Sequence, residues 1–461
     1  MAGFRRPLAL LASALLSSHC LSAPAGGGSA TTANGSAGVI QMPIIHFDSK
    51  ATGILPLVDV GIGNPPQTVR MIIDTGSSDL IAAEAGSAVC KDPEQQCTKS
   101  KSGLILGSFD PNQSKGFEKV AGQTLDTTFG TGESYQGPMV KDTLTLGSSQ
   151  VPAAQIGLME TGSIPPNTPS FSVFGVGPVG NEGAAKQYVN VPARMKEAGV
   201  INKNAYGVYL NDFSKRHSTP AEPLQLMKRT YQKLTLPDLE GSDGSITFGG
   251  MDTAKFDGKL QDVPLIPDDN GKFGQFVVSF SSMSVSGQAG AGAGVPNDGA
   301  KKKRAQAAKG GAGADAAAAN FVSNPLPALL DTGNPALDLP LEAVTGMAKA
   351  LGINTQKDGD ATLLGPMPCS MGASMNLVLG FNKDAVKMSV PFSLLMVPAT
   401  GKEGAAGQCV MPQIVGLKDV GLTSLGAPFL QAMYAVFDVD QNQISLAQAK
   451  MNTTESKLVP F

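Results

Sequence analysis

A short acidic motif occurs twice in this chain, each time directly after a run of apolar residues. The two copies are Met71–Ser77, which reads MIIDTGS, and Ala328–Asn334, which reads ALLDTGN. An apolar strand that ends in Asp-Thr-Gly holds a carboxylate at a fixed depth, the Thr hydroxyl can bond the backbone of a facing copy, and Gly lets the chain approach closely. The repeated motif therefore predicts a rigid pair of carboxylates, Asp74 and Asp331.

The repetition extends beyond the motif itself. Each copy is followed, at a similar distance, by a short run that ends in Gly, at Val173–Gly175 and at Ser424–Gly426. The second run is the weaker of the two because Ser424 is polar. A single Asp-Thr-Gly is often only a turn capped by its Asp side chain. Two copies with similar followers indicate two related lobes, each of which supplies one carboxylate.

A pair of carboxylates suits acid–base chemistry on a water molecule. Two carboxyl groups about one hydrogen bond apart cannot both be ionised, so one pKa rises and the pair shares a proton. One carboxylate then takes a proton from water while the other carboxyl gives a proton to a substrate carbonyl. This chemistry requires no cofactor, no metal and no covalent intermediate. The sequence has only three histidines, at His19, His46 and His217. So few histidines leave little material for a metal site or a His-based triad.

The composition favours protein or peptide partners. A net charge of -3 leaves no strongly basic surface for nucleic acid or an anionic membrane. With 461 residues, 42% of them hydrophobic, the chain can bury one large core or two medium-sized ones. We expect a monomer that acts on protein or peptide substrates, binds no nucleic acid and has no membrane-spanning segment.

The N-terminus has the three parts of a secretory signal. A charged start precedes the apolar run Leu8–Leu16, and small residues follow. We therefore expect residues 1–23 to be a signal peptide, residues 24–43 to be a short disordered or pro-segment, and the protein to be secreted, with the cell wall or the vacuole as alternative destinations. Removal of the signal leaves an even number of cysteines, which predicts two disulfides. The N-glycosylation sequons are at Asn34, Asn112 and Asn452.

The rest of the chain has the pattern of a mostly β protein. Short β-branched or apolar runs alternate with Gly, Pro, Asn and Asp, and the clearest helical patterns are Val191–Ala198 and Leu341–Leu351. Residues 287–319 form a Gly/Ala-rich insertion around Lys301–Arg304, which we expect to be an exposed loop or linker. Its four basic residues are either a site of proteolytic processing or charges that only keep the loop solvated. The expected lobes are an N-terminal β-lobe over 44–210 and a C-terminal β-lobe over 211–455.

Several longer motifs resemble the pepsin-like aspartic protease family, especially its fungal, yapsin-like members. The resemblance extends from about Ile44 to Asn452, and its motifs are Val60–Gln67, Ile73–Leu80, Phe129–Glu133, Asp142–Gly147, Ile246–Lys255, Leu329–Gly333 and Val436–Lys450. It implies a mostly β, bilobal fold with a long substrate cleft between two related β-lobes, covered by a flap hairpin. It also implies an aspartic-type endopeptidase with an acid pH optimum.

The resemblance also implies roles for individual residues. Ser77 should donate a hydrogen bond to the outer oxygen of Asp74, while Thr75 and Thr332 should brace the two turns against each other. The other supporting residues are Gly76, Gly333 and Asn334. The flap residues are Phe129, Gly130, Thr131 and Gly132. The implied disulfides are Cys90 to Cys97 and Cys369 to Cys409.

The chain departs from the family pattern at several positions. Phe129 stands where the family has the flap tyrosine, and Ile81 where it has the tryptophan that this tyrosine bonds, so we expect these two side chains to pack together. The usual Thr or Ser of the second motif is Asn334, followed by Pro335, and we expect its amide to donate to Asp331. An Asp that often follows near the end is Ala427, a change we interpret as structural.

These departures leave open a second function class, a protein with the same fold that binds peptides or proteins without cutting them. A coplanar pair of carboxyls would favour the enzyme. Displacement of Asp331 by Asn334 or Pro335 would favour the binding protein.

Overall fold

The computed structural model describes residues 38–49, 53–91, 97, 106–130, 132–164, 171–213, 244–287, 319–399 and 406–461. The expected signal peptide at 1–23, most of the segment 24–43, nearly all of the insertion 287–319 with Lys301–Arg304, Asn34 and Thr131 lie outside these residues. Among the described residues, no helix is long and apolar enough to cross a membrane.

The structure is mostly β, as predicted. The N-terminal half contains β1 (Ile40–Ser49), β2 (Gly53–Ile62), β3 (Gln67–Asp74), β4 (Leu80–Ala83), α1 (Ala88–Lys91), η1 (Pro111–Gln113), β5 (Glu118–Thr128), β6 (Ser134–Leu146), β7 (Ser149–Met159), β8 (Thr161–Ser163), β9 (Ser172–Gly175), α2 (Val191–Glu197) and β10 (Ala205–Tyr209). The next elements are β11 (Gly244–Phe248), β12 (Gly250–Asp252), β13 (Phe256–Pro264), β14 (Val277–Gly287), β15 (Leu326–Asp331), β16 (Leu337–Pro340), α4 (Leu341–Leu351), β17 (Thr355–Asp358), β18 (Ala361–Leu364), β19 (Met367–Pro368) and η4 (Cys369–Ala373). The last elements are β20 (Met375–Phe381), β21 (Val386–Pro391), η5 (Phe392–Leu394), β22 (Val397–Pro398), β23 (Gln408–Val410), β24 (Ile414–Leu417), β25 (Thr423–Gly426), α5 (Ala427–Leu430), β26 (Met433–Asp438), β27 (Gln443–Ala449) and β28 (Leu458–Pro460).

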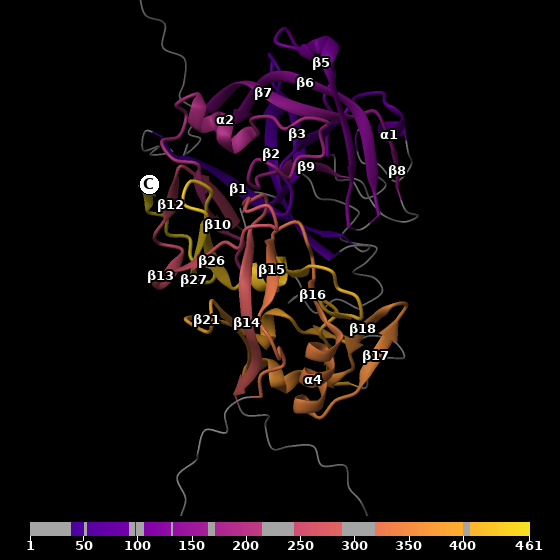
Figure 1. Ribbon diagram of the computed structural model, residues 1–461, viewed down its shortest axis with the longest axis vertical. Helices are drawn as coiled ribbons and strands as arrows, with labels where there is room; N and C mark the ends of the chain where they lie inside the picture. The colour runs from indigo at the N-terminus through magenta and orange to yellow at the C-terminus, as the bar shows by residue number, and fades with distance from the viewer. Residues whose placement is uncertain are drawn as a thin grey trace, which may run out of the picture. The chain divides into compact units, whose positions relative to one another are not determined.

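Two large sheets organise these strands. The first runs in the order β13-β27-β26-β10-β11-β1-β2-β3-β9-β4-β7-β6-β5, with β8 paired to β6. The second runs in the order β17-β18-β24-β16-β25-β15-β14-β20-β21. Figure 1 shows the strands β2 to β9, coloured indigo to magenta, gathered apart from the strands β14 to β21, coloured salmon-red to orange. The two gathered groups are the two β-lobes of the fold.

The same strand arrangement occurs once in each lobe. In the first lobe β3 is parallel to β9, β9 is antiparallel to β4, and β4 is parallel to β7. In the second lobe β15 is parallel to β25, β25 is antiparallel to β16, and β16 is parallel to β24. The repeated strand pairing confirms the internal repetition expected from the two Asp-Thr-Gly motifs.

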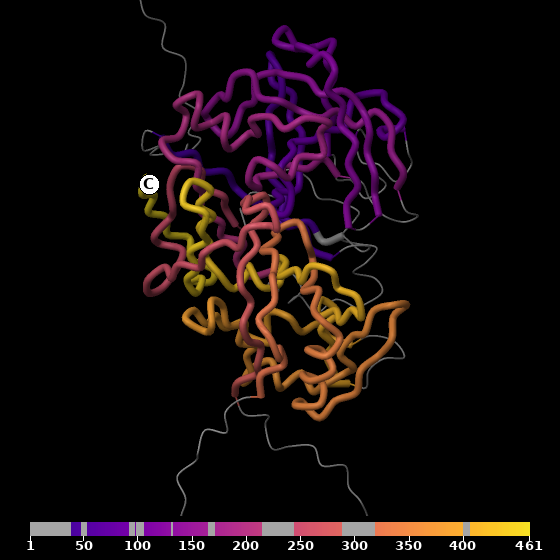
Figure 2. The backbone as a smooth tube through the Cα atoms, in the orientation of Figure 1, coloured from indigo at the N-terminus to yellow at the C-terminus, as the bar shows by residue number. Residues whose placement is uncertain are grey.

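Strands from both ends of the chain join in the middle of the first sheet. β1 pairs with β11, and β10 pairs with both β11 and β26 (Figure 2). Among the described residues, the first strand begins at Ile40, before the expected start of the lobe at 44. The folded part also extends past the expected end at 455, because β28 pairs with β12. A single large cluster of buried apolar residues runs through both halves, from Ile40 to Leu446.

The helices and disulfides agree closely with the sequence-based expectations. α4 has the expected bounds. α2 is capped at its N-terminus by Asn190, whose side-chain oxygen accepts a hydrogen bond from the Ala193 N–H. The two disulfides join Cys90 to Cys97 and Cys369 to Cys409, with Cα–Cα distances of 5.4 and 5.0 Å.

Candidate active site

The two motif aspartates lie at equivalent points of the repeated strand arrangement. Asp74 is the last residue of β3 and stands beside Gly175 of β9. Asp331 is the last residue of β15 and stands beside Gly426 of β25. Both aspartates therefore end a strand that is parallel to the strand of the Gly-ending run that follows in sequence.

The two carboxyl groups meet because the motif glycines leave room for them. A Cβ on Gly76 would lie 2.5 Å from Oδ2 of Asp331, and a Cβ on Gly333 would lie 2.6 Å from Oδ1 of Asp74. Any side chain at either position would collide with the opposite carboxyl group. Each carboxyl group therefore lies against the glycine of the opposite turn, close enough for Asp74 to affect the pKa of Asp331.

The two threonines join the turns by reciprocal hydrogen bonds. The Thr75 hydroxyl donates to the Leu330 carbonyl at 2.8 Å and accepts from the Thr332 N–H at 2.9 Å. The Thr332 hydroxyl donates to the Ile73 carbonyl at 2.7 Å and accepts from the Thr75 N–H at 3.0 Å. Both threonines are fully buried. This symmetric brace fixes the separation of the two carboxyl groups.

Asp74 receives hydrogen bonds from its own turn. The Gly76 N–H donates to its Oδ1 at 2.8 Å, and the Ser77 hydroxyl donates to its Oδ2. Hydrogen bonds to a carboxylate favour its charged form. Both oxygens of the Asp74 carboxyl group therefore accept a hydrogen bond from its own turn.

Asp331 is placed to carry the proton. Burial, together with the neighbouring negative charge of Asp74, raises the pKa of Asp331 well above its usual value. The Gly333 N–H donates to its Oδ1 at 2.8 Å and opposes this shift only in part.

The expected hydrogen bond from the Asn334 amide to Asp331 is wrong. The Asn334 Nδ2 instead donates to Oδ2 of Asp338 at 2.7 Å and to Oγ of Ser424 at 2.8 Å. The longer Asn side chain reaches these acceptors on β16 and β25, whereas a Ser at the equivalent point of the first motif reaches its own aspartate. The two halves of the site are therefore chemically unequal.

The residues expected to form the flap lie at the turn between β5 and β6. The Phe129 N–H donates to the Glu133 carbonyl at 2.8 Å, and the Gly132 N–H donates to the Phe129 carbonyl at 2.9 Å. The Phe129 ring is partly buried against an apolar cluster that contains Ile81 and Tyr135, and its ring centre lies 6.1 Å from that of Tyr135. Phe129 and Ile81 thus belong to one apolar cluster, as the paired loss of the polar groups predicts.

Sequence reasoning missed a polar cluster that supports the first turn. Asp79 accepts from the Tyr188 hydroxyl at 2.7 Å and from the Gly183 N–H at 2.6 Å. The Asn181 amide donates to the Gly76 carbonyl at 3.0 Å. Asp79 follows the first motif directly, but nothing in the sequence pairs it with a segment more than a hundred residues later.

Other predicted site features lie away from the aspartates. Asn112, in η1, and Asn452 are both exposed, as a glycosylation sequon requires.

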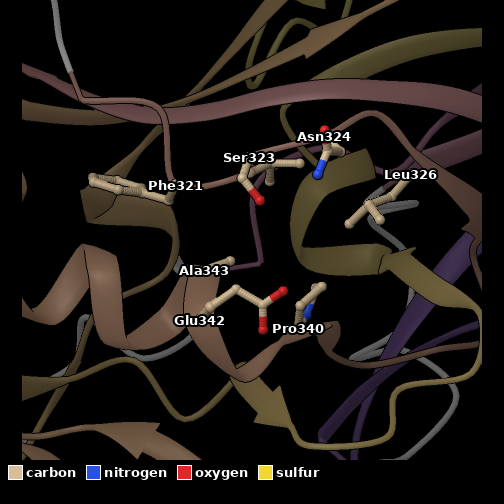
Figure 3. A pocket seen from close by; sticks show the side chains of 8 residues that line it. Phe321, Ser323, Asn324, Leu326, Pro340, Glu342 and Ala343 are labelled. Carbon is tan, nitrogen blue, oxygen red and sulfur yellow. The ribbon is translucent and has the colours of Figure 1, made fainter.

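A pocket of about 100 Å³ lies at the start of β15 and α4, at the opposite end of β15 from Asp331. Figure 3 shows Ser323 and Asn324 across this pocket from Glu342. In the described part of the chain, no group of three or more His, Cys, Asp or Glu side chains is placed to hold a metal ion.

Comparison with known protein families defines the class. The family model for eukaryotic aspartyl proteases matches residues 57–221 and 302–449, which is more than half of the chain. The chain belongs to this family, whose fungal members it resembles, and its enzyme class is aspartic-type endopeptidase, a peptide hydrolase.

Individual relatives are fungal proteins of moderate similarity. The chain is 28% identical over 411 residues to a probable aspartic-type endopeptidase opsB of Aspergillus fumigatus, covering 87% of this chain and 70% of the relative. It is 25% identical over 405 residues to secreted aspartic protease 3 of Candida albicans, covering 86% of this chain and 80% of the relative. The crystal structure of the aspartic proteinase from Irpex lacteus has the same fold, with a TM-score of 0.59 at 18% identity, covering 91% of this chain and 100% of the other.

Proposed function

We propose that this protein is an aspartic endopeptidase that hydrolyses peptide bonds with a water activated between Asp74 and Asp331. The observation that carries the proposal is the close pair of carboxyl groups, each against the glycine of the opposite turn, at equivalent points of two repeated strand arrangements. A buried pair of acids is otherwise unfavourable for folding.

The unequal surroundings of the two aspartates assign their roles. Asp74, charged and held by Ser77 and Gly76, removes a proton from the water as the water oxygen attacks the peptide carbonyl carbon. Asp331 gives its proton to the carbonyl oxygen in the same step. When the tetrahedral intermediate collapses, the C–N bond breaks, Asp74 returns a proton to the leaving nitrogen, and Asp331 recovers its own. Aspartic proteases are the known example of such a pair with one shared proton.

This assignment gives an acid pH optimum. Asp331 must be protonated to act as an acid, so activity falls as pH rises through its pKa. Because that pKa is raised, activity persists above the pH at which an ordinary carboxyl group has ionised.

The setting of the enzyme follows from the sequence and its relatives. The expected signal peptide at 1–23 and a Candida relative named as a secreted protease support export of a monomer that acts on proteins or peptides. The sequons at Asn34, Asn112 and Asn452 are the proposed glycosylation sites. Phe129, Gly130, Thr131 and Gly132 are proposed to form the flap over the substrate.

Hydrolysis of a denatured protein across pH, with and without a statine-type inhibitor, tests the proposal. We expect acid-optimal cleavage that the inhibitor blocks. Asp331→Asn should reduce kcat/KM by roughly a thousandfold or more, with an unchanged thermal melting curve in acid, because it removes the acid of the pair. Full activity in this variant would overturn the assignment of Asp74 and Asp331 as the catalytic pair, here called the dyad. Peptide binding without cleavage by the unaltered protein would support the non-catalytic alternative.

A further inference from the structure

We propose that Asp338 and Ser424 are positioning residues that hold Asn334 away from Asp331, and that this arrangement keeps Asp331 protonated to higher pH. The inference rests on the proposed role of Asp331 as the acid of the pair. It concerns residues that the dyad mechanism itself does not use.

The Asn334 side chain has no free donor hydrogen for Asp331. Its two amide hydrogens are taken by Oδ2 of Asp338, at 2.7 Å, and by Oγ of Ser424, at 2.8 Å. Its Oδ1 accepts from the Ala336 N–H at 2.8 Å. An Asn side chain has two donor hydrogens, so Asn334 has no further hydrogen to donate to Asp331.

Strand pairing presents the two acceptors together. Asp338 of β16 and Ser424 of β25 are directly opposite residues of an antiparallel pair, so their side chains lie on one face. The backbone of Asn334 is also fixed there, because its carbonyl accepts from the Ala427 N–H at 2.8 Å. The polar Ser424, which made the second sequence repeat look weaker, thus has a defined partner.

The first half of the site has the opposite arrangement. Ser77 stands three residues after Asp74, as Asn334 stands three residues after Asp331, and its hydroxyl donates to the aspartate of its own turn. Among the hydrogen bonds of the described residues, the Asp331 carboxyl group receives one bond from its own turn, from the Gly333 N–H at 2.8 Å. The hydrogen bonds of Asn334 to Asp338 and Ser424, which form the positioning network, therefore deprive Asp331 of a side-chain donor.

The ionisable groups near the aspartate pair come from β3, β16 and β10. Asp74, at the end of β3, faces it directly and raises its pKa. Asp338, from β16, is half-buried, and burial raises its own pKa while the Asn334 amide lowers it. Burial, together with the charge of Asp74, raises the pKa of Tyr206 on β10, whose hydroxyl donates to the Val176 carbonyl at 2.7 Å. None of these groups supplies a positive charge that would ionise Asp331.

Restoring a hydroxyl tests the proposal. In Asn334→Ser the hydroxyl should donate to Asp331 as Ser77 does to Asp74 and favour the charged form. We expect the alkaline limb of the kcat/KM profile to move to lower pH by on the order of one pH unit, with the acid limb unchanged. Asp338→Ala and Ser424→Ala, which free one amide hydrogen of Asn334 each, should move the limb in the same direction by less.

A matched control is Ser282→Ala. The Ser282 hydroxyl donates to Oδ1 of Asp384 at 2.6 Å, which is the same kind of Ser–Asp bond in the same lobe but on β14 and outside the site. We expect this variant to keep the alkaline limb of the parent.

A measurement without substrate separates this inference from the proposed function. The carboxyl resonance of ¹³C-labelled Asp331, assigned by its loss in Asp331→Asn, should titrate at lower pH in Asn334→Ser than in the parent. That shift in a protein that cuts nothing would uphold the positioning network and reject hydrolysis. An unchanged titration in folded Asn334→Ser would overturn the network even if the parent cuts peptides. Should that variant not fold, unchanged titration in both Asp338→Ala and Ser424→Ala would overturn it.

Discussion

Single hydroxyl groups carry the contact between the two Asp-Thr-Gly turns. The Thr332 hydroxyl satisfies two buried backbone groups of the other turn, the Ile73 carbonyl and the Thr75 N–H. Valine has the shape of threonine without these bonds, so a Thr-to-Val change isolates their contribution. The sequence supplied the residue types, and the reciprocal pattern of bonds required both turns in place.

We expect Thr332→Val to lower the free energy of unfolding by roughly 1–3 kcal/mol for each of the two backbone groups left unpaired. Activity should also fall, because the carboxyl separation is no longer fixed. Denaturant unfolding in acid measures the loss of stability, and kcat/KM measures the loss of activity. Thr145→Val is the control, since the Thr145 hydroxyl is buried and has no partner in the described part of the chain. Equal losses in the two variants would contradict the brace.

At the scale of elements, the flap hairpin depends on apolar packing. Phe129 is partly buried against the cluster around Ile81, and Ile81 itself is fully buried with Gly157 close beside it. A tryptophan at 81 would therefore overpack this cluster. In our interpretation, apolar packing of Phe129 against this cluster, rather than a hydrogen bond, holds the proposed flap closed.

Two substitutions at Phe129 test this interpretation of the flap. Phe129→Tyr should keep kcat/KM within about twofold, because the ring and its packing stay. Phe129→Ala should lower kcat/KM about tenfold, because the buried ring no longer holds the hairpin down. Val120→Ala, in β5 and against the same cluster, should lower thermal stability with little effect on kcat/KM. A tenfold loss in Phe129→Tyr would show that a polar contact at this position governs the flap.

At the scale of the whole molecule, buried acids around the first turn make stability depend on pH. Burial raises the pKa of Asp79 and of Glu182, and the charge of Asp79 adds to the rise at Glu182. Oε1 of Glu182 is buried without a partner among the described residues. A pKa that is higher in the folded than in the unfolded state contributes stability below the unfolded value, and that stability is lost as pH rises through the folded value.

We therefore expect the protein to be more stable in acid than at neutral pH, with Glu182 among the causes. Glu182→Gln should leave the melting temperature in acid nearly unchanged and raise it at neutral pH, because Gln resembles the protonated acid and carries no charge. Melting curves at about pH 4 and about pH 7 measure the difference. The exposed Glu455 provides the control variant, Glu455→Gln. A parent-like pH difference in Glu182→Gln would exclude this residue as a cause.

The sequence by itself determined the strand endings, the two aspartates and the helices at 191 and 341, because apolar runs, capping residues and turn residues act over short distances. It also indicated the duplication, since both copies kept Asp-Thr-Gly. Only the tertiary structure decided where Asn334 donates. Asp338 and Ser424 come together through the β16–β25 pairing, and their separation in sequence hides that contact. The same holds for Asp79 and Tyr188, since hydrogen bonds between distant segments depend on side-chain reach and burial that only the packed fold sets.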